Sequence, residues 1–262
     1  MTDTNNTLLS VTDIHKSFGK LKALNGVDME VEAGSITGLI GPNGSGKTTL
    51  FNVVTGFYKK DRGHGKIIFQ GTQIDGMDPA QIADEGIQRT FQISQATRKM
   101  TVMENLLLAS KQQPGESIFN SFFRPRLLIN TEQDQLRKAH EILETIQLED
   151  LMDEFAGNLS GGQKKLLALG RMLMADPELM MLDEPTAGVN PTLTNDLLEI
   201  IQKLRQDTGK TYFLIEHSMK VISSLCDYVY VLDFGENLTA GTPEEVQSDE
   251  KVLEAYLTGQ TS

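Results

Sequence analysis

The chain has 262 residues, of which 39% are hydrophobic and 23% are charged, which is enough to bury a sizeable core in one compact unit with a satellite subdomain. Its formal net charge of −12 argues against wholesale nucleic-acid binding, because that function needs a basic surface. A single cysteine, Cys226, excludes an internal disulfide and indicates a packing role. The four histidines indicate no metal-ligand cluster.

The sequence contains no stretch that approaches the roughly 18 apolar residues needed to cross a bilayer. Residues 1–7 are polar and lack the apolar centre of a signal peptide. We therefore expect any contact with a membrane to go through a partner protein.

The first part of the chain predicts strands separated by turns. Residues 8–14, 26–31 and 66–69 have the composition of strands. Residues 32–34 and 61–65 carry the glycines and polar residues that are typical of turns.

A glycine-rich loop follows a predicted strand at Ile36–Ile40 and leads into a predicted helix near Thr49. The loop fits the pattern G-x-x-x-x-G-K-[ST] and consists of Gly41, Pro42, Asn43, Gly44, Ser45, Gly46, Lys47 and Thr48. Glycines let the backbone wrap around phosphate oxygens, and a helix N-terminus favours negative charge. We expect Lys47 to hold the β- and γ-phosphates of a nucleotide and the Thr48 hydroxyl to bind Mg²⁺. The alternative is a strand-to-helix turn that binds nothing.

The middle of the chain predicts two helices. A T-x-x-E start at Thr101 introduces the first. The second carries apolar residues at helical spacing, namely Leu136, Ala139, Ile142, Leu143 and Ile146. Between the helices, residues 111–130 mix aromatic residues with arginine, namely Phe119, Phe122, Phe123, Arg124 and Arg126. This segment is either a loop folded over the helices or a contact for a membrane protein or for lipid headgroups.

A second loop with glycines lies at residues 159–163. Ser160 is a suitable helix N-cap, and Gln163 completes a capping box with it. The residues between them, Gly161 and Gly162, add nothing to an ordinary first helical turn. A phosphate that approaches a helix N-terminus needs such bare backbone, so this loop is a second candidate for phosphate binding.

Two acidic residues follow a short apolar run. Residues 179–182 predict a parallel strand buried on both faces, with Asp183 and Glu184 at its end. We expect Asp183 to hold Mg²⁺ through the water shell of the metal, and Glu184 to polarise an attacking water. Taken alone, the pair also fits a solvated strand end, but the glycine-rich loop favours the catalytic interpretation.

The last part of the chain predicts a helix near residues 193–205, a strand at 211–216 that ends at His217, and a hairpin that begins at 228–232. Residues 242–245 read as the capped start of a late helix.

With these motifs in this order, the chain resembles the ATP-binding subunits of ABC transporters over nearly its whole length. The resemblance implies an α/β fold, in which a P-loop NTPase (RecA-like) core carries an antiparallel β subdomain and an inserted α-helical subdomain. It implies one nucleotide-binding domain over residues 8–257, with the helical subdomain at about 93–165. We therefore expect an ATPase that uses ATP and Mg²⁺.

The same resemblance implies roles for single residues. Phe18 stands at the position that stacks on adenine, Gln92 at the Q-loop glutamine that contacts Mg²⁺ and the attacking water, and His217 at the switch histidine beside the γ-phosphate. The expected catalytic residues are Glu184, His217, Gln92 and Lys47. The expected ATP-binding residues are Phe18, the loop from Gly41 to Thr48, and Thr49. The expected metal ligands are Thr48, Gln92 and, through water, Asp183.

The resemblance also implies partners. In a head-to-tail dimer with a second ABC ATPase subunit, which is an identical or a different chain, Ser160, Gly161, Gly162 and Gln163 of one subunit close over the ATP held by Lys47 of the other. Two integral-membrane permease subunits and an extracytoplasmic substrate-binding protein complete the expected complex, which contains no nucleic acid. We expect the chain at the cytoplasmic face of a bacterial inner or plasma membrane.

One departure from the family pattern is Asn190, which stands where the D-loop usually carries an aspartate. The segment at residues 187–191 resembles the branch that imports branched-chain and neutral amino acids, as do residues 65–71, 100–106 and 255–257. We therefore expect uptake of these amino acids. The alternatives are another cargo, such as urea or an exported lipid, and a soluble ABC protein of translation or DNA repair. A simple nucleotide kinase does not account for the second glycine loop.

Overall fold

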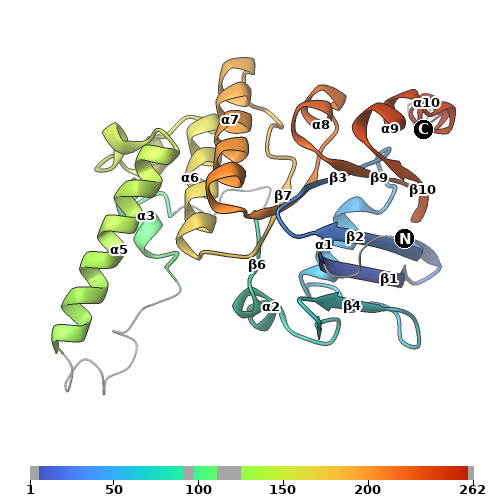
Figure 1. Cartoon of the computed structure of the whole chain (residues 1–262), viewed down its shortest axis with the longest axis horizontal. Helices are drawn as coiled ribbons and strands as arrows, with labels where there is room; N and C mark the ends of the chain where they lie inside the picture. The colour runs from blue at the N-terminus through green and yellow to red at the C-terminus, as the bar shows by residue number, and fades with distance from the viewer. Residues whose placement is uncertain (1–5, 91–96, 111–124, 259–262) are drawn as a thin grey trace. The chain divides into compact units, whose positions relative to one another are not determined.

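The computed structural model describes residues 6–90, 97–110 and 125–258. These residues form two compact units (Figure 1). The first, the core unit, lies within Met1–Arg89, Glu178–Pro185 and Ile201–Ser262. The second, the helical unit, lies within Thr90–Pro177 and Thr186–Ile200. A single domain over residues 8–257 stays a prediction, as do the boundaries of its helical part.

Within its described residues, the core unit is built around a six-stranded sheet in the spatial order β10-β9-β3-β8-β7-β6 (Figure 1). The strands are β3 (Ile36–Ile40), β6 (Ile87–Arg89), β7 (Leu179–Asp183), β8 (Thr211–Ile215), β9 (Tyr228–Asp233) and β10 (Glu236–Gly241). Neighbouring strands pair in parallel, except that β9 and β10 form the predicted antiparallel hairpin. Every residue of β3, β7 and β8 is buried, because parallel strands are covered on both faces.

A second sheet of the core unit has the order β2-β1-β4-β5 and is antiparallel, as expected. Its strands are β1 (Thr7–Phe18), β2 (Leu21–Glu32), β4 (Lys66–Phe69) and β5 (Thr72–Gln73). β1 and β2 are longer than predicted because they pair with each other along most of their length. Both sheets and helix α1 (Lys47–Val54) contribute to one apolar cluster, which includes Leu9, Phe51 and Phe213.

Several helices complete the core unit. They are α1, α2 (Pro79–Glu85), α8 (Met219–Leu225), α9 (Pro243–Ser248) and α10 (Glu250–Thr258). Helix α7 (Pro191–Thr208) begins among the residues of the helical unit and ends among those of the core unit. Helices α1, α7 and α9 were predicted from the sequence, but α2, α8 and α10, which have 7, 7 and 9 residues, were not. Such short helices carry little periodic signal.

The helical unit contains α3 (Val102–Leu107), α5 (Pro125–Thr145) and α6 (Gly161–Met174), with single 3₁₀ turns at Glu149–Leu151 and Ala156–Asn158. Thr101 and Glu104 form the predicted capping box of α3, and Ser160 and Gln163 form that of α6. The helix starts predicted from these motifs are therefore confirmed. No helix in the described part of the chain is both long and apolar enough to cross a membrane.

Helices α3, α5 and α6 pack closely around Gly170 of α6. A Cβ at this position would lie 2.7 Å from Ile146 Cδ1 and 3.0 Å from Leu106 Cδ2. The predicted apolar stripe of α5 is buried from Ala139 onward, whereas Leu136 at its start is 42% exposed. The stripe is thus buried only where α5 lies against its neighbours.

Two sequence predictions concern parts of the chain that the structure does not describe. Gln92 lies outside the described residues, as do residues 111–124 of the aromatic segment, and the side chains of residues 125–131 are not described either.

Cys226 is buried, as predicted, and burial raises the pKa of its thiol.

The expectation that the histidines form no ligand cluster is wrong for two of them. His15 lies on β1, and His64 lies in the turn before β4, and both side chains reach the carboxylate of Asp13. The antiparallel pairing of β1 with β4 brings these residues together, because it sets the turn beside the strand.

Candidate functional site

The glycine-rich loop connects the end of β3 to the start of α1, as predicted, and its conformation requires glycine at two positions. Gly41 and Gly46 have φ angles of 148° and 105°. A Cβ at Gly41 would lie 2.0 Å from the carbonyl oxygen of Leu232, and one at Gly46 would lie 2.6 Å from that of Ala23. Helix α1 begins after Gly46 without a side-chain cap. Its first N–H groups therefore suit an anionic ligand such as phosphate.

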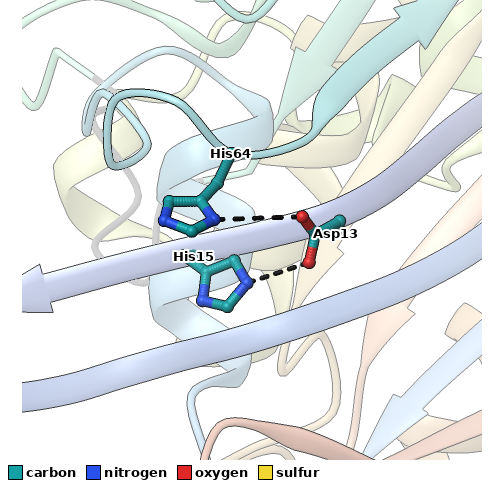
Figure 2. A group of neighbouring side chains, drawn as sticks. All are labelled: Asp13, His15 and His64. Carbon is teal, nitrogen blue, oxygen red and sulfur yellow. Dashed lines mark hydrogen bonds and ion pairs between the residues drawn. The ribbon is translucent and has the colours of Figure 1, made fainter.

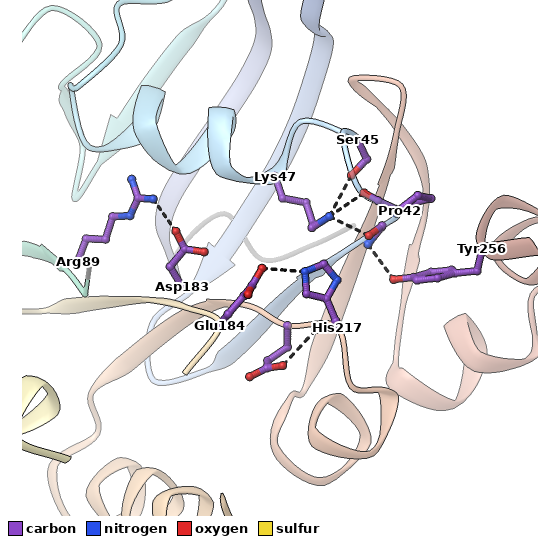
Figure 3. Close-up of polar contacts among 10 residues, drawn as sticks. Pro42, Ser45, Lys47, Arg89, Asp183, Glu184, His217 and Tyr256 are labelled. Atoms are coloured by element: carbon purple, nitrogen blue, oxygen red, sulfur yellow. Dashed lines mark hydrogen bonds and ion pairs between the residues drawn. The ribbon is translucent and has the colours of Figure 1, made fainter. Parts of the chain in front are cut away.

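Lys47 is the first residue of α1, and its side chain folds back over the loop (Figure 3). Its Nζ donates hydrogen bonds to the carbonyl oxygens of Gly41 and Pro42, both at 2.8 Å. Burial lowers the pKa of Lys47, and the nearby charges of Glu184 and Asp183 partly offset this effect. The loop thus holds a buried cation that a phosphate group stabilises when it binds.

Replacing Lys47 with Ala is expected to weaken nucleotide binding by about tenfold to a hundredfold, since a hydrogen bond to a charged group contributes roughly 1.5–3 kcal/mol. Titration of the purified chain with ATP by calorimetry measures this loss. Lys203→Ala, which removes the same charge from an exposed position of α7, is the matched control. ATP affinity equal to that of the wild type would remove Lys47 from the phosphate site.

Asp183 ends β7 and forms a buried ion pair with Arg89 at the end of β6. Arg89 Nη2 lies 2.6 Å from Asp183 Oδ2, and the two side chains are 7% and 1% exposed. Arg89 Nη1 also donates a hydrogen bond to Asn52 Oδ1 of α1 at 2.6 Å. β6 and β7 are adjacent parallel strands, so their carboxyl ends meet at one edge of the sheet. Arg89 therefore fixes the carboxylate that was predicted to bind the metal.

Glu184, directly after β7, and His217, shortly after β8, lie side by side (Figure 3). His217 Nε2 is 2.8 Å from Glu184 Oε1. Glu184 has a positive φ of 48°, which is uncommon for a residue with a side chain, and its N–H donates to the carbonyl oxygen of Ile215. Strained backbone of this kind is found at functional sites, where it aims a side chain. Lys47, Asp183, Glu184 and His217 thus lie at the carboxyl edge of one sheet.

Phe18 ends β1 in the core unit and is 44% exposed, so it is not a core residue. Its ring and the Tyr58 ring form a T-shaped pair with centroids 5.3 Å apart, and Lys16 Nζ lies 5.1 Å from the centroid of the Phe18 ring. An exposed aromatic ring of this kind fits the predicted stacking on adenine, which stays a prediction.

The second glycine loop belongs to the helical unit, and its two glycines differ. A Cβ at Gly162 would lie 2.4 Å from Leu193 Cδ1, so packing accounts for this glycine. A Cβ at Gly161 would meet no atom within 4 Å. Gly161 therefore has no packing reason to be glycine, whereas Gly162 has one. The predicted contact of both glycines with ATP stays a prediction.

Asn190, at the expected aspartate position of the D-loop, lies directly before helix α7. Its Oδ1 accepts a hydrogen bond from the N–H of Leu193 at 2.9 Å. This is an N-cap interaction, which Asn and Asp provide about equally well. Asn190 thus caps α7 as an aspartate would, but it lacks the negative charge of an aspartate.

Tyr256 of α10 contacts the glycine-rich loop, which the sequence analysis did not foresee. Its hydroxyl accepts a hydrogen bond from the N–H of Gly41 at 3.0 Å (Figure 3). Burial raises the pKa of Tyr256. The sequence signal was present, because residues 255–257 had been singled out, but only as a mark of a family branch.

We expect Tyr256→Phe to weaken ATP binding about threefold to tenfold, because it removes one hydrogen bond of roughly 0.5–1.5 kcal/mol from the backbone of the loop. The same calorimetric titration as for Lys47→Ala measures the change. Tyr228→Phe, at a half-exposed position of β9, is a control for loss of a hydroxyl group. Identical affinities of wild type and Tyr256→Phe would show that this contact does not support the loop.

Comparison with known proteins gives two family matches in this chain. The family described as ABC transporter matches residues 24–187. The family described as branched-chain amino acid ATP-binding cassette transporter matches residues 236–257, which include Tyr256.

Individual relatives match over nearly the whole chain. The probable branched-chain amino acid transport ATP-binding protein LivG of Archaeoglobus fulgidus is 44% identical over 255 residues, which are 97% of this chain and 97% of the relative. The high-affinity branched-chain amino acid transport ATP-binding protein LivG of Escherichia coli K12 is 40% identical over 250 residues, 95% of this chain and 97% of the relative. A solved ADP conformation of an ATP-binding cassette of an ABC transporter has a TM-score of 0.82 at 40% identity, and the match covers 96% of this chain and 98% of that one.

Proposed function

Because this chain belongs to the ABC transporter family and is one of its ATP-binding, ATP-hydrolysing cassettes, we propose that it energises the uptake of branched-chain or other neutral amino acids. The names of its relatives and the match at residues 236–257 support this cargo. The observation that carries the hydrolytic activity is the pair of Glu184 and His217, whose side chains lie 2.8 Å apart at the sheet edge that also holds Lys47.

The side chains at this edge suit the hydrolysis of a bound nucleotide. Lys47 and the N–H groups of α1 bind and orient the phosphates. Glu184 accepts a hydrogen bond from the attacking water and polarises it. An ionised carboxylate only accepts hydrogen bonds, so His217 Nε2 donates to Glu184 and fixes its orientation.

The donor set also fits Mg²⁺, which prefers hard oxygen ligands. The exposed Thr48 hydroxyl in the first turn of α1 and the Asp183 carboxylate are of this kind. When bound, Mg²⁺ neutralises the charge that develops on the phosphate oxygens. Gln92 is the further predicted ligand.

The proposal includes a second ABC ATPase subunit. In this dimer, the ATP that Lys47 of one subunit holds is covered by Ser160, Gly161, Gly162 and Gln163 of the other. The start of α6 supports this contact with ATP. Ser160 and Gln163 cap the helix, and no atom lies within 4 Å of a Cβ at Gly161, which leaves room for a ligand. Hydrolysis is mainly positioning and charge neutralisation, so a site completed only on closure couples ATP binding to movement of the subunits.

The other partners of the proposed transporter are two membrane permeases and an extracytoplasmic substrate-binding protein, with this chain at the cytoplasmic face of a bacterial inner or plasma membrane. Nucleic acid is not among the partners, and the net charge of −12 supports this.

Mass spectrometry of the proteins that co-purify with the tagged chain from gently solubilised native membranes tests the assembly. We expect two permeases and an ATPase subunit. Recovery of only ribosomal or DNA-repair proteins would replace the proposal with a soluble function, and recovery of a permease for urea or of a lipid exporter would replace the cargo.

A further inference from the structure

Three side chains that the proposed ATP site does not use converge on one point of the antiparallel sheet (Figure 2). His15 Nε2 lies 2.9 Å from Asp13 Oδ1, and His64 Nδ1 lies 3.9 Å from Asp13 Oδ2. The two imidazole rings are tilted by 39° with respect to each other, and their centroids lie 4.2 Å apart. One potential ligand atom of each residue lies within 4.8 Å of those of the other two.

The strand is distorted in a way that aims Asp13 at the two histidines. The pairing of β1 with β2 shifts register between Val11 and Ile14, and Asp13 has a positive φ of 49°. The N–H of Asp13 donates a hydrogen bond of 2.9 Å to Asp28 Oδ1, which holds the distorted backbone in place. Bulges of this kind redirect a side chain at the cost of regular pairing.

The turn that carries His64 is also held against β1. A Cβ at Gly65 would lie 2.0 Å from the carbonyl oxygen of Thr12 and 2.3 Å from that of Asp13, so only glycine permits this approach. The N–H of Asp61 donates to the carbonyl oxygen of His15, and Asp61 Oδ1 accepts from the N–H of Ser17. Backbone contacts therefore position the histidines independently of any ion pair between the side chains.

We propose that Asp13, His15 and His64 form a binding site for a divalent transition-metal ion of the zinc type. Two imidazole nitrogens and a carboxylate oxygen are a usual ligand set for Zn²⁺, with a fourth position left for water. Ligand atoms around a tetrahedral zinc ion stand roughly 3.4 Å apart. The distances from His15 Nε2 to Asp13 Oδ1, 2.9 Å, and from His64 Nδ1 to Asp13 Oδ2, 3.9 Å, fall on either side of this value. Mg²⁺ and Ca²⁺ prefer oxygen ligands and fit this set poorly.

The side chains of His15, Asp13 and His64 are 23%, 55% and 50% exposed. A metal ion thus reaches the site from solvent. The site joins β1 to the segment between α1 and β4, which also carries Tyr58, the ring that packs on Phe18.

The test is calorimetric titration of the full chain with Zn²⁺, after removal of metals by a chelator, without nucleotide and with no histidine tag. His217→Gln is introduced in every sample, so that the imidazole beside Glu184 cannot take part. We expect one equivalent of Zn²⁺ to bind. His15→Gln or His64→Gln should weaken Zn²⁺ binding by at least about tenfold, because losing even a residue that only orients a metal ligand lowers metal affinity by about that much. His140→Gln, at an exposed position of α5, is the matched control and should leave binding unchanged.

Two further readings make the result decisive. Co²⁺ bound at this site should give the intense visible absorption of tetrahedral coordination, and an excess of Mg²⁺ should not displace it. Asp13→Asn, which keeps the shape of the side chain, serves as the second variant if a histidine variant lowers the metal-free melting temperature. Equal Zn²⁺ affinity in all variants, or no binding at micromolar Zn²⁺, would show that the cluster is only an ion pair within the sheet.

Discussion

Replacing Glu184 with Gln is expected to lower the rate of ATP hydrolysis by about 10²–10⁴-fold, the usual contribution of a general base. Gln keeps the size of the side chain and its hydrogen bond with His217 but cannot take a proton from water. ATP binding should stay intact, because Lys47 and the N-terminus of α1 are unchanged. The variant should therefore accumulate as the closed, ATP-bound dimer.

Steady-state phosphate release and size-exclusion chromatography in ATP measure these two effects. The matched control is Glu199→Gln, which makes the same chemical change at an exposed position of α7. Wild-type turnover of Glu184→Gln would exclude Glu184 as the base. Loss of ATP binding would show that Glu184 contributes to binding of ATP and not only to its hydrolysis.

Arg89→Met is expected to lower the free energy of unfolding by about 3–5 kcal/mol, the usual cost of breaking a buried ion pair by removing one partner. Met fills most of the volume, but it leaves the carboxylate of Asp183 buried without its guanidinium partner. It also removes the hydrogen bond to Asn52 and the contact of the guanidinium with the Phe51 ring, whose centroid lies 5.5 Å away. Urea denaturation of the purified chain measures the change.

A double-mutant cycle separates the ion pair from general packing. In Arg89→Met/Asp183→Asn the unpaired charge is gone, so the double variant should lose less stability than the sum of the two single variants. Additive losses would mean that Arg89 stabilises the fold through its other contacts and not through Asp183. A loss below about 1 kcal/mol in Arg89→Met would place the pair among exposed ones, which contribute little.

The features that sequence reasoning predicted depend on residues close together in the chain. The capping boxes at Thr101 and Ser160 join residues three positions apart, and the strand, loop and helix around Lys47 are continuous. Buried strands such as β7 carry their own apolar run. Such features can be predicted from the sequence because they depend on neighbouring residues and not on tertiary contacts.

The features that it missed depend on which distant segments of the chain become neighbours. Arg89 and Asp183 are 94 positions apart, and Gly41 and Tyr256 are 215 apart. The strand order of the sheet brings the first pair together, and no local pattern specifies that order. The convergence of His15 and His64, and the contact of Gly162 with Leu193, also join segments that are distant in the chain, so no local pattern predicts them.

The most direct test of the account is uptake of labelled leucine into proteoliposomes that contain the proposed complex, with the proposed substrate-binding protein on the opposite face. We expect leucine to accumulate only when ATP is present on the side of this subunit, and Glu184→Gln to abolish the accumulation. ATP hydrolysis without movement of leucine or of any other neutral amino acid would contradict the proposed function.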